Sequence, residues 1–124
     1  MTIHQISVFL ENRAGQLADI TAILSERRVD LRAINIAETA DYGVLRLIVD
    51  DAQRASAVLL ERGFILTMTP VVAVAVPDRP GGLSEVLQII SRESMDVEYM
   101  YSVFGQKNGL AYMIFRVGDP DRLD

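Results

Sequence analysis

One six-residue motif occurs twice in this sequence, and the repeat limits the folds that are open to the chain. The two copies are Asn12-Arg13-Ala14-Gly15-Gln16-Leu17 and Asp78-Arg79-Pro80-Gly81-Gly82-Leu83. Each copy follows a run of alternating apolar residues and precedes a stretch with helical periodicity. Each is therefore expected to be a glycine turn between a strand and a helix, with unpaired helix N–H groups facing the turn.

The repeat extends well beyond the motif. An offset of 66 residues, which aligns Gly15 with Gly81, holds without a gap through most of the following segment. It aligns apolar residues with apolar residues, and it also aligns Asp30 with Asp96 and Gly43 with Gly109. Matches at one offset together with the same order of elements indicate an internal repeat.

The first copy has the pattern of a complete small α+β unit. The first expected elements are a strand over residues 6–10 and a helix over 17–28. Strands over 29–39 and 44–49 follow, joined by a turn at 40–43. The last elements are a helix capped by Asp50 or Asp51 and ended by Gly63, and a strand that runs from Phe64 and is closed by Pro70. This β-α-β-β-α-β order is that of the ferredoxin-like unit. Two helices are then expected to cover one face of a four-stranded antiparallel sheet.

The second copy repeats that order only in part. Asp119-Pro120 is a good helix start, yet the sequence ends at Asp124. The predicted domains are therefore a complete repeat over residues 1–69 and an incomplete repeat over 70–124, which lacks its last helix and strand. Either further residues belong to the natural chain, or a partner covers the apolar strand at 110–117 and the open edge of the sheet.

Composition excludes several classes of protein. The apolar fraction of 50% is ample for a core, and a net charge of -5 argues against a nucleic-acid surface. Without cysteine the chain has no disulfide, thiolate metal site or cysteine nucleophile. No signal peptide or stretch of membrane-spanning length is visible, so a soluble cytoplasmic protein is expected.

The sequence offers little for catalysis. His4, the single histidine, lies near a terminus and is expected at the surface, and no serine has a visible base beside it. The acidic pairs Asp50-Asp51 and Asp119/Asp121 are typical of helix caps rather than metal ligands. We therefore expect no enzyme activity, no metal and no cofactor.

The two motifs resemble the N/D-R-P-G-x-L turn of ACT domains, and the resemblance covers nearly the whole chain. It is closest to small stand-alone tandem ACT proteins that carry no attached enzyme. The resemblance implies two tandem ferredoxin-like ACT units with a regulatory, allosteric role, which bind a free amino acid at interfaces between paired units. It also implies a homodimer or association with an enzyme of amino-acid metabolism, and no nucleic-acid or membrane partner.

The resemblance further implies which residues hold the ligand. In the serine-binding ACT domain of phosphoglycerate dehydrogenase, an asparagine in the turn and another at the start of the second strand bind serine. The first corresponds to Asn12 and Asp78 here, and the second to Asp30 and Asp96, so three of the four positions carry aspartate. Ala14 replaces the usual proline of the motif.

A zwitterion suits these groups chemically. Backbone N–H groups at a helix N-terminus attract a carboxylate, and an aspartate accepts hydrogen bonds from an ammonium group. The second turn is the preferred ligand turn, because Pro80 and its double glycine match the motif better. The candidate ligand-binding residues are Asn12, Ala14, Gly15, Gln16, Leu17, Asp30, Asp78, Arg79, Pro80, Gly81, Gly82, Leu83 and Asp96.

Each candidate has a simpler alternative explanation. The glycines can make turns that bind nothing, and Asp30 and Asp96 can be solvated residues at strand starts. Arg13 and Arg79 can be solvated turn residues. The apolar and aromatic side chains of the copy's second strand are expected mainly to pack between units: Tyr99, Met100, Tyr101 and Phe104. The alternative function is a structural module that pairs sheets without a ligand.

Overall fold

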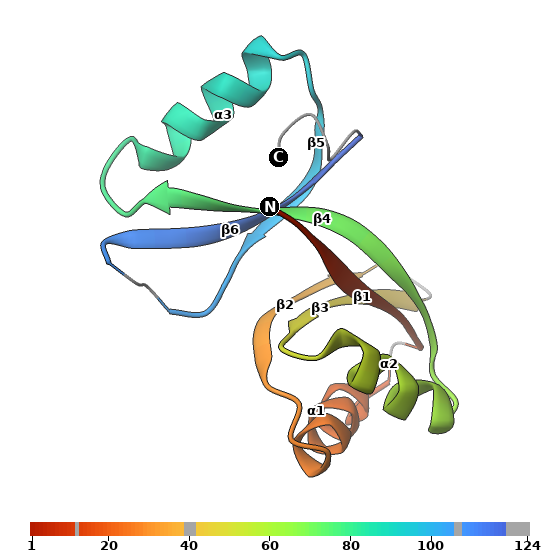
Figure 1. Cartoon of the computed structure of the whole chain (residues 1–124). Coiled ribbons are helices and arrows are strands. Elements are labelled where there is room, and N and C mark those ends of the chain that lie inside the picture. Colours follow the sequence, from red (N-terminus) through yellow and green to blue (C-terminus); the bar gives the residue numbers. More distant parts are fainter. Residues whose placement is uncertain (12, 39–41, 106–107, 119–124) are drawn as a thin grey trace. The chain divides into compact units, whose positions relative to one another are not determined.

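The computed structural model describes residues 1–11, 13–38, 42–105 and 108–118 (Figure 1). The elements are β1 (Thr2–Glu11), α1 (Gln16–Glu26), β2 (Leu31–Glu38), β3 (Tyr42–Val49), α2 (Ala52–Glu61), β4 (Ile65–Pro77), α3 (Gly82–Arg92), β5 (Val97–Ser102) and β6 (Leu110–Val117). The chain divides into two compact units, His4–Thr69 and Met1–Ile3 together with Pro70–Asp124. The predicted helix start at Asp119-Pro120 lies outside the described residues.

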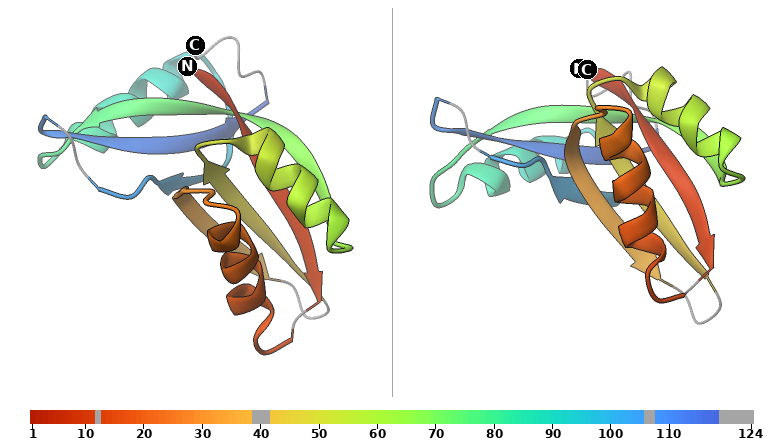
Figure 2. Two further views of the ribbon diagram at one scale, coloured as in Figure 1. Left: turned by 60° about the horizontal axis from the view of Figure 1, so that its bottom comes forward. Right: turned by 90° about the horizontal axis from the view of Figure 1, so that it is seen from below.

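The first unit has the predicted ferredoxin-like fold. Its strand order is β2-β3-β1-β4, and β1 and β2 both pair with β3 in antiparallel register. Ile6 lies opposite Leu47 and Val8 opposite Leu45, and both helices cover this face of the sheet (Figure 2). The buried core consists of Ile6, Val8, Leu10, Ile20, Ile23, Leu24, Val29, Leu45, Leu47, Ala55, Val58 and Leu59.

The ends of the helices have clear local causes. Asp51 caps α2, because its Oδ1 accepts the N–H of Arg54 at 3.1 Å. Gly63 ends the same helix as predicted, with φ +86°, and its N–H donates to the carbonyl oxygen of Leu60 at 3.1 Å. The N–H of Phe64 donates to the carbonyl oxygen of Leu59 at 3.1 Å, which completes a Schellman motif.

The other two helices end in the same motif without glycine. After α1, the N–H of Val29 donates to the carbonyl oxygen of Leu24 at 2.9 Å, and Arg28 has φ +57°. After α3, Ser94 takes the same place with φ +55°. Because Val29 belongs to this turn, β2 begins at Leu31, two residues later than predicted.

The predicted end of the fourth strand at Pro70 is wrong. β4 continues through Pro70 to Pro77, so one strand belongs to both units. β4 lies between β1 and β6 in the strand order, and its pairing with β6 begins at Val72, beyond the proline. The carbonyl oxygen of Pro70 accepts a hydrogen bond from Nη1 of Arg116 at 2.8 Å.

The second unit has the strand order β4-β6-β5, with α3 on one face. Met1–Ile3 belong to this unit, a grouping that the repeat alignment did not predict. The N–H of Ala73 donates to the carbonyl oxygen of Met1 at 2.9 Å, and the Met1 ammonium group donates to the carbonyl oxygen of Ala73 at 3.3 Å. This reciprocal exchange is typical of an antiparallel pair. The start of β1 therefore lies beside β4, where a fourth strand of the repeat belongs.

The helix-facing side of the second unit is less covered than that of the first. Val74 and Met113 are half-buried, whereas the aligned residues Val8 and Leu47 are fully buried. In the first unit α2 supplies this cover, and the described part of the second unit contains α3 as its helix. Across the described ranges, no helix is long and apolar enough to cross a membrane.

Candidate ligand-binding site

Both predicted glycine turns are present and have the same backbone geometry. Gly15 and Gly81 each have φ +86° and stand directly before a helix, in a conformation that favours glycine. In the first turn the N–H of Arg13 donates to the carbonyl oxygen of Glu11 at 2.8 Å. In the second turn the N–H of Arg79 donates to the carbonyl oxygen of Pro77 at 2.9 Å. The repeat in sequence is thus also a repeat in hydrogen bonding.

The second turn is braced by its own residues. Nη2 of Arg79 donates to both carboxylate oxygens of Glu85, at 2.9 and 3.1 Å. A Cβ atom at Gly82 would overlap the carbonyl oxygen of Pro77. The N–H of Asp78 donates to the carbonyl oxygen of Gly109 at 3.0 Å. The double glycine of this motif is therefore explained by close packing, and Pro80 and Gly81 are exposed beside it.

The first turn has space beside it. A pocket of about 330 Å³ is lined by Phe9, Glu11, Arg13, Gln16, Asp19, Arg62, Gly63, Phe64 and Ile65. Gln16 also lines a smaller pocket of about 60 Å³ next to Leu17 and Ile36. Its Oε1 is buried and has no hydrogen-bond partner among the described residues. A buried acceptor without a donor is costly, so this atom offers a place for a ligand N–H group.

The remaining residues of the first turn provide fewer groups that could bind a ligand. Arg13 forms an ion pair with Glu11, with Nε 3.2 Å from Oε2, but both side chains are mostly exposed and the pair is weak. Ala14 and Leu17 are exposed. Asn12 lies outside the described residues.

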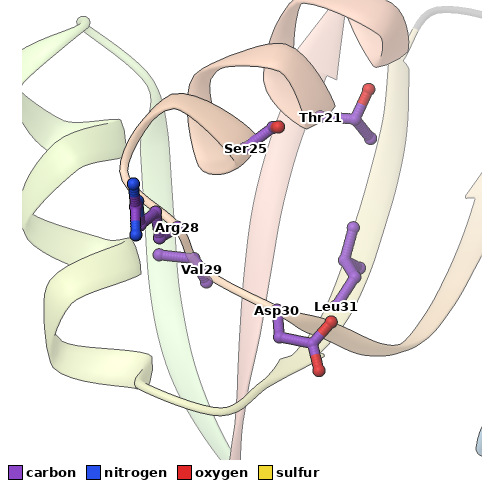
Figure 3. A pocket seen from close by; sticks show the side chains of 6 residues that line it. All are labelled: Thr21, Ser25, Arg28, Val29, Asp30 and Leu31. Atoms are coloured by element: carbon purple, nitrogen blue, oxygen red, sulfur yellow. The ribbon is translucent and has the colours of Figure 1, made fainter.

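Asp30 lies at the opposite end of α1 from the turn. Its N–H donates to Oδ1 of Asp50 at 2.9 Å, and its carboxylate accepts a hydrogen bond from Nη1 of Arg32 at 3.2 Å. A pocket of about 380 Å³ lies beside it (Figure 3). The residues that line this pocket are Thr21, Ser25, Arg28, Val29, Asp30 and Leu31.

The structure does not bring the turn and the strand-start aspartate of one unit together. The eleven residues of α1 separate Gly15 from Asp30, and the eleven residues of α3 separate Gly81 from Asp96. Eleven helical residues span about 16 Å, which is longer than a free amino acid. A free amino acid therefore does not span the turn and the strand-start aspartate of the same unit.

The motif gave no indication of three residues that line the pocket beside Asp30. Thr21 and Ser25 are four residues apart and lie near one face of α1, and Arg28 follows that helix in its left-handed turn. These polar residues were the feature of the sequence that could have indicated the pocket. In the second unit the aligned residues are Leu87, Ser91 and Ser94, none of which is a cation.

The histidine and the aromatic residues singled out in the sequence lie outside these two pockets. His4 is exposed, as predicted. The rings of Tyr99 and Tyr101 stack with their centroids 6.5 Å apart, while Phe104 is exposed. Packing of these aromatic residues between units stays a prediction. In the ranges that the structure describes, no three His, Asp or Glu side chains form a group that could hold a metal ion.

Comparison with known proteins identifies the family. The sequence matches the family model described as an ACT domain pair over residues 1–124. The chain belongs to the ACT domain pair family. No curated protein matches its sequence.

Solved structures agree with this assignment. Protein BT0572 from Bacteroides thetaiotaomicron has 38% sequence identity and a TM-score of 0.91, with 99% of this chain and 84% of that chain covered. The ligand-free regulatory subunit of aspartate kinase from Thermus thermophilus has 16% identity and a TM-score of 0.68, with 99% and 92% covered. At 16% identity the second likeness shows a shared fold. The ACT resemblance of the two glycine motifs and the predicted fold are confirmed.

Proposed function

We propose that this ACT domain pair is a regulatory protein that binds a free amino acid. It signals through self-association, as a homodimer, or through a partner enzyme of amino-acid metabolism, and it is itself no enzyme. The observation that supports this most is the identical geometry of the turns at Gly15 and Gly81, each of which opens a helix N-terminus. The family assignment, and a regulatory subunit among its structural relatives, support the regulatory role.

The proposed ligand lies between units. Its carboxylate binds N–H groups at a glycine turn of one unit, and its ammonium group binds Asp30 or Asp96 of another. Because such a ligand binds only the paired arrangement, it shifts the equilibrium between separate and associated chains.

The first turn is the better candidate, in contrast to the preference for the second turn drawn from the motif. Arg79 of the second turn is engaged by Glu85, and Gly82 packs against Pro77. The first turn has a pocket and the unsatisfied Oε1 of Gln16. That oxygen adds an acceptor for the ligand's ammonium group or for a polar side chain.

Calorimetric titration of the full chain with each of the twenty amino acids tests the proposal. At least one is expected to bind and to raise the melting temperature as its concentration increases. Gln16→Leu is expected to weaken binding, whereas the matched variant Gln88→Leu, on an exposed position of α3, leaves it unchanged. If none of the twenty binds, the proposed function is wrong.

A structural module that pairs sheet edges is the second candidate. β2 is an edge strand of the first unit, and its Ile36 is 45% exposed. Under this alternative the chain associates with the same constant whether or not amino acids are present. Sedimentation equilibrium with and without the amino acid that binds tightest separates the two functions.

A further inference from the structure

We propose that the pocket beside Asp30 receives the side chain of the ligand and that Arg28 selects an acidic amino acid, aspartate or glutamate. This inference rests on the proposed function, because it uses Asp30 as the seat of the ligand's ammonium group. The pocket is an open depression of about 380 Å³ at the protein surface, which leaves room for the side chain of an amino acid. A ligand held at Asp30 has this space directly beside it.

The charge of the pocket favours an anionic side chain. Asp30 is already paired with Arg32, whose Nη1 lies 3.2 Å from Oδ2. Arg28 lines the same pocket, and its guanidinium has no ion-pair partner among the described residues. In Figure 3 the guanidinium of Arg28 and the carboxylate of Asp30 lie apart, on either side of Val29. Asp50 accepts the N–H of Asp30 and does not line the pocket.

Two hydroxyl groups line the pocket together with Arg28. Figure 3 shows Ser25 and Thr21 on α1, above the segment that carries Asp30 and Leu31. The single proton of the Thr21 hydroxyl is directed at the carbonyl oxygens of Leu17 and Ala18, both 3.0 Å away, so Thr21 does not donate to a ligand. Ser25 is exposed and can donate to a ligand oxygen. A guanidinium binds both oxygens of a carboxylate in one plane, which an ammonium group cannot do.

The backbone at Arg28 provides a clean way to remove its charge. Arg28 has φ +57°, in the region that glycine prefers, and the aligned residue Ser94 has φ +55°. Glycine at either position adopts the positive φ of the turn without a steric cost. Arg28→Gly therefore removes the guanidinium without removing a favoured backbone conformation, and Ser94→Gly is its matched control in the other repeat.

The experiment is calorimetric titration of the full chain with aspartate, glutamate, asparagine, glutamine and lysine. The unmodified chain is expected to bind an acidic amino acid at least about tenfold more tightly than its amide. Arg28→Gly is expected to reduce that preference to about twofold or less, while Ser94→Gly keeps it. Circular dichroism melting confirms that both variants are folded.

The outcomes separate this inference from the proposed function. If the unmodified chain binds a neutral or basic amino acid most tightly, the inference is overturned and the proposed function stands. A preference for acids that survives in Arg28→Gly overturns it as well. If no amino acid binds at all, the proposed function fails and the inference fails with it.

Discussion

At the scale of single residues, backbone crowding decides which side chains the turns accept. A Cβ atom at Gly82 would overlap the carbonyl oxygen of Pro77, so α3 would have to move away from the end of β4. Gly82→Ala is expected to lower the free energy of unfolding by about 1–3 kcal/mol in urea denaturation. Gly118 has open space around it, and Gly118→Ala is expected to change stability by less than about 0.5 kcal/mol. Equal midpoints for the two variants would contradict this explanation.

The left-handed residues after the helices predict the opposite effect of a glycine. Ser94 holds φ +55° at the end of α3, a conformation that costs a residue with a Cβ atom about 1 kcal/mol. Ser94→Gly is therefore expected to raise the free energy of unfolding by up to about 1 kcal/mol. Ser91→Gly, three residues earlier and inside the helix, is expected to lower it by about 0.5–1 kcal/mol. If both variants shift the urea midpoint in the same direction relative to the unmodified chain, the turn at Ser94 carries no strain.

At the scale of elements, burial of one helix face holds the first unit together. Leu59 and Leu60 are neighbours on α2, but Leu59 is fully buried in the core and Leu60 is 57% exposed. Leu59→Ala is expected to cost about 2–5 kcal/mol because it leaves a cavity. Leu60→Ala is expected to cost less than about 0.5 kcal/mol. Thermal melting of both variants measures the difference, and similar losses would mean that α2 does not pack as described.

The elements themselves were largely predictable, because periodicity follows burial. Alternation around Ile6 and the helical spacing of Ile20 and Leu24 indicate which residues face the core of the first unit, although Leu17, which the same spacing includes, is exposed. The error came at Pro70, where proline was interpreted as the end of a strand. Proline marks a missing donor, and in β4 the pairing with β6 begins beyond Pro70, at Val72. Sequence pattern alone does not say where along a strand the pairing with each neighbour begins.

At the scale of the whole molecule, pairing of the N-terminal residues with β4 makes a prediction for hydrogen exchange. The amide of Ala73 donates to the carbonyl oxygen of Met1, so it is expected to be protected in the full chain. A chain that starts at residue 4 is expected to lose that protection. The amide of Asp19 in the other unit, which donates to the carbonyl oxygen of Gly15 at 3.0 Å, serves as the control and keeps its rate. Unchanged exchange at Ala73 in the shortened chain would refute the pairing.

The candidate site was predictable only in its parts. The motif located the turn at Gly15 and the resemblance located Asp30, and both stand where the sequence places them along the chain. α1 lies between them and carries the chain away from the turn. Arg28 belongs to no motif, and its interest comes from the pocket and from a guanidinium that has no ion-pair partner in the described part of the chain.

The strands β1 and β4 each contribute residues to both units, and this bears on how the molecule can be divided. A cut between Thr69 and Pro70 severs β4 in mid-strand. It also leaves residues 1–3 on one product while their partner Ala73 goes to the other. Neither product keeps all its strands. A sequence with two copies of one module is therefore expected to resist division between Thr69 and Pro70, whether by recombination or by protein engineering.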